Sequence, residues 1–113
     1  MKSSDSFLMV IKDNKINSDN IDFLLNSVRN LLFNGYKNIF LDMNNVESVD
    51  NSFLNFLEKS DKLVDLNLFN LNSNIMSVLF ITKFDKFVKI YNAEIDAKEA
   101  LKPIVKRNFS LVS

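Results

Sequence analysis

The amino-acid sequence predicts one α/β domain, with a mostly parallel, mixed sheet of about four to five strands and about four helices packed on it. The chain has 113 residues, the usual size of a single compact domain. Hydrophobic residues make up 47% of it, which is enough for one packed core. Short apolar runs alternate with segments in which apolar residues recur at helical spacing. This alternation indicates parallel strands covered by helices.

The first half of the chain begins with a strand and continues with the clearest helix. Residues 7–11 are a continuous apolar run, which indicates a strand. Ser18 or Asp19 is the predicted cap of the next helix, because a short side-chain oxygen accepts from the free first-turn amides. Gly35, the only glycine, predicts the end of that helix, since glycine adopts the left-handed conformation at little cost. Between these positions lies one apolar stripe at helical spacing: Ile21, Leu24, Leu25, Val28, Leu31 and Leu32.

A second strand and a second helix are predicted in the middle of the chain. Residues 39–43 have the hydrophobicity of a strand that is covered on both faces. Asp50, Asn51 and Ser52 are three candidate helix caps in a row. The apolar residues that follow predict a helix over residues 53–64.

The last third of the chain repeats the alternation. Residues 66–71 indicate a strand, and residues 72–81 indicate a third helix that begins with its own cap. Residues 87–91 alternate loosely and predict the last strand. A closing helix is expected over residues 96–103, because it starts with a pattern like a capping box and a proline limits its end. Residues 108–113 are expected to be loose.

The composition narrows the function classes. Lys plus Arg and Asp plus Glu each number 14, so no basic excess points to nucleic acid or to an anionic membrane. The chain has no cysteine and no histidine, which removes thiolate chemistry, the commonest general base and the commonest metal ligand. No stretch is long enough for a signal peptide or a membrane span, so a cytoplasmic address is the default. We expect a non-enzymatic protein without catalytic residues, cofactor or metal.

Asp42 follows a predicted buried strand, where open parallel sheets tend to place functional groups. One interpretation is the phospho-acceptor aspartate of a response-regulator receiver, another small α/β domain. That chemistry needs a pair of acids for Mg²⁺ and a late lysine beside the phosphoryl group. The chain offers only Asp13 as the early acid, with Lys86 and Lys89 as late lysines. The alternative is that Asp42 accepts hydrogen bonds from local amides, which is common for aspartate.

Ser52 has a structural and a regulatory interpretation. It is positioned to cap the second helix, as is Asp50. A phosphate on a serine at a helix N-terminus is also tolerated, because free amides and the helix dipole favour an anion there. Phosphorylation would add about −1.5 to −2 charges on a surface that already carries Asp50. Such a change would act as a binding switch.

The segment from residue 39 to residue 57 resembles the central signature of STAS domains, which are the domains of bacterial anti-sigma factor antagonists and are also attached to sulfate transporters. In that family a hydrophobic strand ends in Leu-Asp-Leu, a hydrophobic residue comes four positions after this Asp, and Asp-Ser-Ser-Gly-Leu comes eight positions after it. Asp42, Val46 and Asp50 stand at these intervals. Residues 14–17, 66–71 and 96–101 match further family segments in the right order. The resemblance implies that residues 1–113 form one STAS-type domain.

The resemblance also implies a function. Such domains bind an anti-sigma factor, often a serine kinase, and release the sigma factor that it held. The kinase phosphorylates the second serine of the motif, which corresponds to Ser52 here, and a phosphatase reverses the modification. The partner-binding surface would then comprise the motif and its neighbours: Asp50, Asn51, Ser52, Phe53 and Phe56.

The sequence departs from the family motif at two positions. Asn51 replaces the first serine, and Phe53 replaces the glycine. A bulky Phe53 would hinder a kinase that approaches the backbone closely, whereas an exposed Phe53 with Phe56 would be an apolar contact for a partner. Two other functions stay open: an accessory subunit of an ABC transport complex, and the receiver-like phospho-aspartate domain. A weak homodimer is also expected.

Overall fold

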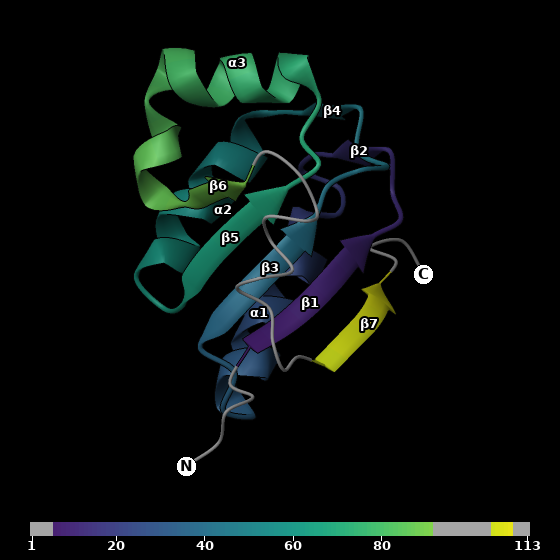
Figure 1. Ribbon diagram of the computed structural model, residues 1–113, viewed down its shortest axis with the longest axis vertical. Helices are drawn as coiled ribbons and strands as arrows, with labels where there is room; N and C mark the ends of the chain where they lie inside the picture. The colour runs from purple at the N-terminus through teal and green to yellow at the C-terminus, as the bar shows by residue number, and fades with distance from the viewer. Residues whose placement is uncertain (1–5, 92–104, 110–113) are drawn as a thin grey trace.

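A five-stranded sheet forms the centre of the molecule (Figure 1). The computed structural model describes residues 6–91 and 105–109. The strand order is β6-β5-β3-β1-β7, and every pairing in this sheet is parallel. The predicted α/β class is therefore confirmed, and the described sheet is more uniformly parallel than the mixed sheet that we expected. The bounds are β1 Ser6–Ile11, β3 Asn38–Asp42, β5 Asp65–Phe69, β6 Lys89–Tyr91 and β7 Val105–Phe109.

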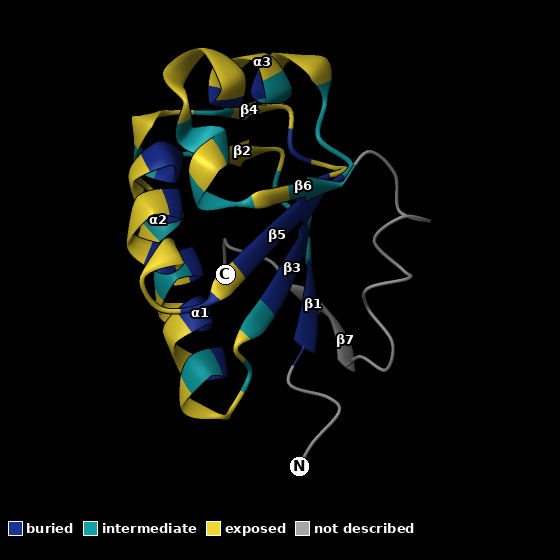
Figure 2. Ribbon diagram, turned by 60° about the vertical axis from the view of Figure 1, so that its left-hand side comes forward, coloured by how far each residue is buried: buried dark blue, intermediate teal, exposed yellow. Residues whose placement is uncertain are grey.

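The helices occupy one face and one end of this sheet (Figures 1 and 2). Helices α1 (Ile21–Phe33) and α2 (Asn51–Asp61) pack side by side on one face. Helix α3 (Ser73–Thr82) lies beyond the carboxyl ends of the strands and is followed by a short 3-10 helix, η1 (Phe84–Phe87). Three predicted helices are thus confirmed. The expected closing helix over residues 96–103 lies outside the described residues.

Alternation along the strands divides the core into two layers. Odd-numbered residues of β1 and β3, such as Met9 and Leu41, are buried against α1 and α2. On the other face, Leu8, Phe40 and Phe69 form a separate buried cluster. Both faces of the central strands are covered, which explains why they read as continuous apolar runs rather than as alternating ones.

A second, two-stranded parallel sheet connects the loops at the carboxyl end of the main sheet. It pairs β2 (Lys15–Ile16) with β4 (Ser48–Val49). Neither strand was predicted, because two residues are too short to show a hydrophobic period. The pairing holds the loop before α1 next to the residues that lead into α2.

The beginning of α1 differs from the prediction. Its N-terminal flanking residue is Asn20, which makes no side-chain cap hydrogen bond, so neither Ser18 nor Asp19 is the cap. The backbone closes this turn instead, because the carbonyl of Asn17 accepts from the amides of Asn20 (3.2 Å) and Ile21 (2.9 Å). The Asn20 side chain turns back, donating to the Lys15 carbonyl at 2.8 Å and accepting from the Asn17 amide at 2.9 Å. The predicted end of α1 is confirmed, since Gly35 has φ +95°.

Two element ends were also predicted wrongly. Helix α2 ends at Asp61, so Leu63 and Val64, expected within the helix, lie in the turn before β5. Asn108 and Phe109, expected to be loose, belong to β7 and pair with Val10 and Ile11 of β1. In both places the hydrophobic pattern is too short to separate a helix end or an edge strand from a loop.

Candidate functional site

The candidate site lies at the carboxyl end of the sheet, where β4 leads into α2 (Figure 1). Backbone hydrogen bonds fix this connection on both sides. The Glu47 amide donates to the Asn14 carbonyl at 2.7 Å, and the Asp50 amide donates to the Ile16 carbonyl at 3.2 Å. The residues that start α2 are therefore held by the small second sheet.

Asp50 is the cap of α2. Its backbone is extended (φ −120°, ψ −169°), and its side chain accepts a 2.8 Å hydrogen bond from the Ser52 amide. Its own carbonyl accepts from the Phe53 amide at 3.0 Å, which begins the helix. This outcome confirms the structural interpretation of the motif for Asp50 and leaves the Ser52 hydroxyl without the capping role.

The surroundings of Asp50 favour its charged form. Hydrogen bonding from the Ser52 side chain is the largest cause that lowers the pKa of Asp50, and the amides of Ser52, Ser18 and Phe53 lower it further. Partial desolvation acts in the opposite direction but does not outweigh these bonds. The carboxylate is thus ionised at neutral pH, where it accepts from the first turn of α2.

Ser52 is half-buried and opens on a groove between α1 and α2. The groove encloses about 110 Å³. Its charged side chains are an acid from α1 and a base from α2, and the full lining is Ile21, Asp22, Leu25, Ser52, Asn55, Phe56 and Lys59. Asn51, beside Ser52, is exposed. The predicted polar residues Asp50, Asn51 and Ser52 therefore lie together at an accessible helix start.

Phe53 and Phe56 do not contribute exposed side chains to this site. Phe53 is 0% exposed and Phe56 is 1% exposed, and their rings stack with centroids 6.0 Å apart. The expectation that they form an apolar contact for a partner is therefore wrong. Both lie on the face of α2 that packs on the sheet, because the helical period turns them toward the core.

Asp42 lies at the end of β3, half-buried among asparagines. Its Oδ1 accepts from the Asn44 amide and from the Asn70 side chain, each at 3.0 Å. This is the local bonding that we gave as the alternative to the receiver chemistry. Lys89 of β6 pairs with Asn67 of β5, and Asn67 pairs with Phe40 of β3. Lys89 is therefore two strands away from β3 and level with Phe40, two residues before Asp42.

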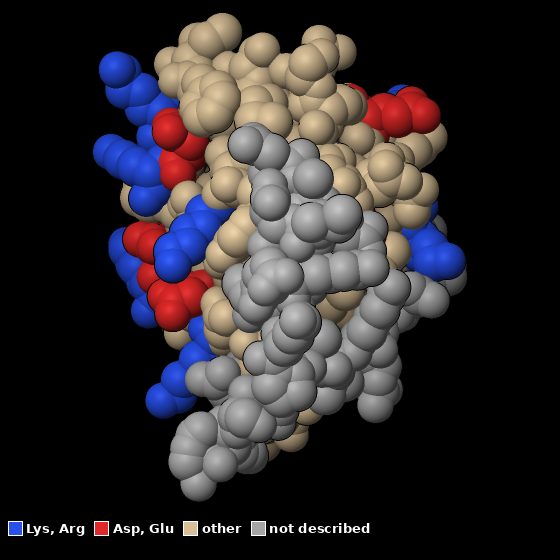
Figure 3. Space-filling view, viewed as in Figure 1, with Lys and Arg blue, Asp and Glu red and all other residues tan. Residues whose placement is uncertain are grey.

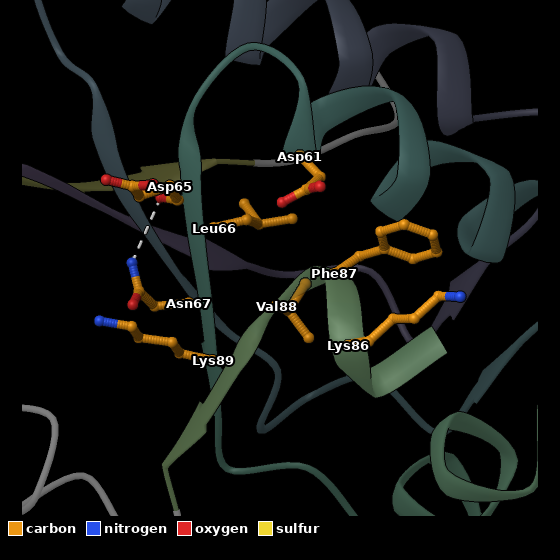
Figure 4. Close-up of a pocket in the computed structure, with 8 residues that line it drawn as sticks. All are labelled: Asp61, Asp65, Leu66, Asn67, Lys86, Phe87, Val88 and Lys89. Atoms are coloured by element: carbon orange, nitrogen blue, oxygen red, sulfur yellow. Dashed lines mark hydrogen bonds between the residues drawn. The ribbon is translucent and has the colours of Figure 1, made fainter. Parts of the chain in front are cut away.

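Lys86 and Lys89 line a separate pocket of about 200 Å³ near the amino end of β5 (Figure 4). Two acids, Asp61 and Asp65, share this pocket, and Lys86 points away from the other charged side chains. The buried amide of Asn67 is already used within the sheet: it donates to the Asn38 side chain at 2.8 Å and to the Ile39 carbonyl at 3.1 Å. The described residues contain no group of three acidic, histidine or cysteine side chains that could hold a metal.

Asn72 is a positioning residue whose role the sequence predicted only in part. It was predicted within the capping segment of the third helix, and its Oδ1 does accept from the Ile75 amide at 2.8 Å. Its Nδ2 also donates to the carbonyls of Val46 (3.3 Å) and Glu47 (3.0 Å). One side chain therefore joins the start of α3 to the loop that leads to Asp50, a contact that no local pattern reveals.

None of the helices in the described ranges is both long and apolar enough to cross a bilayer. The model of the STAS domain family matches residues 1–97. No curated protein matches the sequence.

Solved structures that are similar to this chain agree with the family model. The crystal structure of TM1081 from Thermotoga maritima, a candidate anti-sigma factor antagonist, is 31% identical, with 80% of this chain and 86% of that chain covered and a TM-score of 0.64. The solution structure of TM1081 is 29% identical, with 84% and 80% covered and a TM-score of 0.64. The anti-sigma factor antagonist SpoIIAA, in its unphosphorylated form, shares the fold at 12% identity, with 88% and 87% covered and a TM-score of 0.60. The chain therefore belongs to the STAS domain family.

Proposed function

We propose that this STAS domain is a protein-binding regulator of the anti-sigma factor antagonist type. It binds an anti-sigma factor that is also a serine kinase, and phosphorylation of Ser52 ends the binding. The observation that carries the proposal is the position of Ser52: half-buried, in the first turn of α2, with its backbone amide donating to the ionised Asp50 carboxylate at 2.8 Å. The relation to a candidate anti-sigma factor antagonist at 31% identity supports the same class of partner.

A phosphate on Ser52 would change the charge of this arrangement. About −1.5 to −2 charges would stand beside the carboxylate of Asp50, which already accepts from the Ser52 amide. The first-turn amides and the helix dipole partly offset this repulsion, so α2 stays folded. The binding surface, however, gains a concentrated negative charge, which weakens contact with a partner that approaches Asp50 closely.

Asn51 and Phe53, the departures from the family motif, fit this proposal. Asn51 is exposed and polar, as a serine would be. Phe53 points into the core, so its ring does not cover the hydroxyl of Ser52. The steric objection to phosphorylation, which rested on a bulky side chain at the surface, is therefore weaker than the sequence indicated.

The first test is phosphorylation in native extract supplied with ATP, read by mass spectrometry. Wild-type protein is expected to gain one phosphate at Ser52, and Ser52→Ala is expected to gain none. Ser48→Ala is the matched control, because Ser48 is an exposed serine on the preceding strand. It should be phosphorylated like the wild type. A phosphate on Ser48, or none on any variant, would remove Ser52 as the switch.

The second test captures partners on immobilised wild type, Ser52→Ala and Ser52→Asp. The proposal expects a kinase-like anti-sigma factor on the first two and its loss on Ser52→Asp. Circular dichroism should show that Ser52→Asp stays folded, since an acid in the first turn of a helix is favourable. Equal capture of a transporter ATPase by all three proteins would instead support an accessory subunit of an ABC transport complex.

A further inference from the structure

Helix α3 presents an apolar surface that no described element covers. Val78 is 37% exposed, Phe80 53% and Ile81 80%. The helix contains no charged residue over Ser73–Thr82. In the space-filling view the surface over α3 shows neither acidic nor basic atoms, whereas charges of both signs crowd the left side of the same view (Figure 3). An exposed apolar helix face without charge is a typical interaction surface.

The residues on the outer face of α3 are arranged by size. Ile75 and Leu79 are buried, so the opposite side of the helix carries the exposed residues Ser73, Asn74, Ser77, Phe80 and Ile81. The amino-terminal half of this face is therefore lined by short polar side chains and the carboxyl-terminal half by large apolar ones. A surface of this kind is complementary to itself when a second helix runs in the opposite direction.

We propose that α3 is the interface of a two-fold homodimer in which the α3 helices of two copies pack antiparallel, with Ser77 at the axis. In this arrangement Ile81 of each copy packs near Ser73 of the other, and the small serines allow close approach. A two-fold interface places one surface against itself, so the lack of charge on α3 removes the repulsion that such contacts otherwise meet.

The charges at the two ends of α3 favour the antiparallel direction. Lys83 follows the carboxyl end, and Glu47 lines the groove beside the amino-terminal half of the helix. Both are exposed. Antiparallel packing brings the lysine end of one copy to the glutamate end of the other, whereas parallel packing would bring like charges together. The dipoles of the two helices are also antiparallel in this arrangement, which is favourable.

The interface is small. A helix of ten residues is about 15 Å long, so one pair of such helices covers less than the ~800 Å² per partner that stable complexes bury. The dimer should therefore be weak, with a dissociation constant of about 0.1–1 mM. It should form and dissociate at concentrations that sedimentation can follow.

The test is sedimentation equilibrium over about 0.05–2 mM. Wild type is expected to shift from monomer toward dimer. Ile81→Lys should weaken the association at least about tenfold, because at each end of the contact a charged side chain would replace the apolar one that packs near Ser73 of the other copy. Phe33→Lys is the matched control: Phe33 is 89% exposed, but it lies at the end of α1. It should change the dissociation constant by less than about twofold. A wild type that stays monomeric throughout would overturn the proposal.

Cysteine cross-linking tests the direction and the axis. The chain has no cysteine of its own, so Ser77→Cys carries one thiol, and in the proposed dimer two such thiols meet. A short thiol cross-linker should join Ser77→Cys pairs several times faster than Phe33→Cys pairs, which report random collision. Equal rates would refute the two-fold α3 contact, whatever the sedimentation result. If Ile81→Lys also lost the partner of the Ser52 site while wild type remained monomeric, α3 would belong to that partner and not to a second copy.

Discussion

Replacing Asp50 with alanine removes the side-chain oxygen that accepts the Ser52 amide at 2.8 Å. The loss of an N-terminal cap typically costs about 1 kcal/mol of stability. Helix α2 buries Phe53, Leu54, Phe56 and Leu57, so the cost should appear in the global unfolding of the domain. For a chain of this size it corresponds to a fall in Tm of about 4 °C.

Asp50→Asn separates the hydrogen bond from the charge. Asparagine caps a helix about as well as aspartate, because its side-chain oxygen accepts the same amide. This variant should therefore retain most of the stability that Asp50→Ala loses. It also lacks the negative charge at the candidate site, so any change in partner binding by Asp50→Asn reports electrostatics rather than helix stability.

The same variants predict a pH dependence. Hydrogen bonds from the Ser52 side chain and nearby amides lower the pKa of Asp50 from its usual value of 3.8. A carboxyl group whose pKa is lower in the folded state contributes stability above its unfolded pKa and loses it as pH falls through the folded pKa. The gap in stability between wild type and Asp50→Ala should thus be full at pH 6 and above, and should narrow below about pH 4. Its size is modest, because the side chain is exposed.

The assay is urea unfolding followed by circular dichroism, for the three proteins at pH 3, 4 and 7. The reasoning is refuted if Asp50→Ala is as stable as wild type at pH 7. It is equally refuted if Asp50→Asn and Asp50→Ala lose the same stability, since the cap would then not depend on the accepting oxygen.

Two further predictions concern the packing around the site. Gly35→Ala should lower the free energy of unfolding by about 1–2 kcal/mol, because the backbone there has φ +95°, although nothing lies within 4 Å of an added methyl group. Urea unfolding checks this prediction. An unchanged stability would mean that the turn after α1 relaxes freely. Phe53→Ala should lower the free energy of unfolding by about 3–5 kcal/mol, because it opens a cavity in the core. Phe33→Ala, at an exposed position, should lower it little. Comparable losses of stability for the two variants in thermal unfolding would contradict the core position of Phe53.

The elements that the sequence predicts well are those that depend on neighbouring residues. The stripe of α1 and its stop at Gly35 follow from the helical period and from the left-handed conformation that glycine adopts. The runs at residues 7–11 and 39–41, which became parts of β1 and β3, are apolar throughout because both faces of these strands are buried. The interval from Asp42 to Asp50 contributed to the family resemblance, and each of the two predicted capping segments, residues 50–52 and residues 72–74, does supply the cap of its helix, through Asp50 and Asn72.

The tertiary structure decided which side chains meet and which face outward. The pattern of α2 includes Phe53 on an apolar face, but only the packing on the sheet shows that this face leaves nothing for a partner. Ser18 and Asp19 were plausible caps, but helix α1 starts after Asn20. The Asn20 side chain donates to the carbonyl of Lys15, which belongs to the strand that pairs with β4. The contacts of Asn72 with the Glu47 loop and of β7 with β1 join segments far apart in the sequence. Local periodicity reports how each segment prefers to fold, whereas these contacts depend on the three-dimensional competition for burial and hydrogen bonds, which no short stretch of sequence contains.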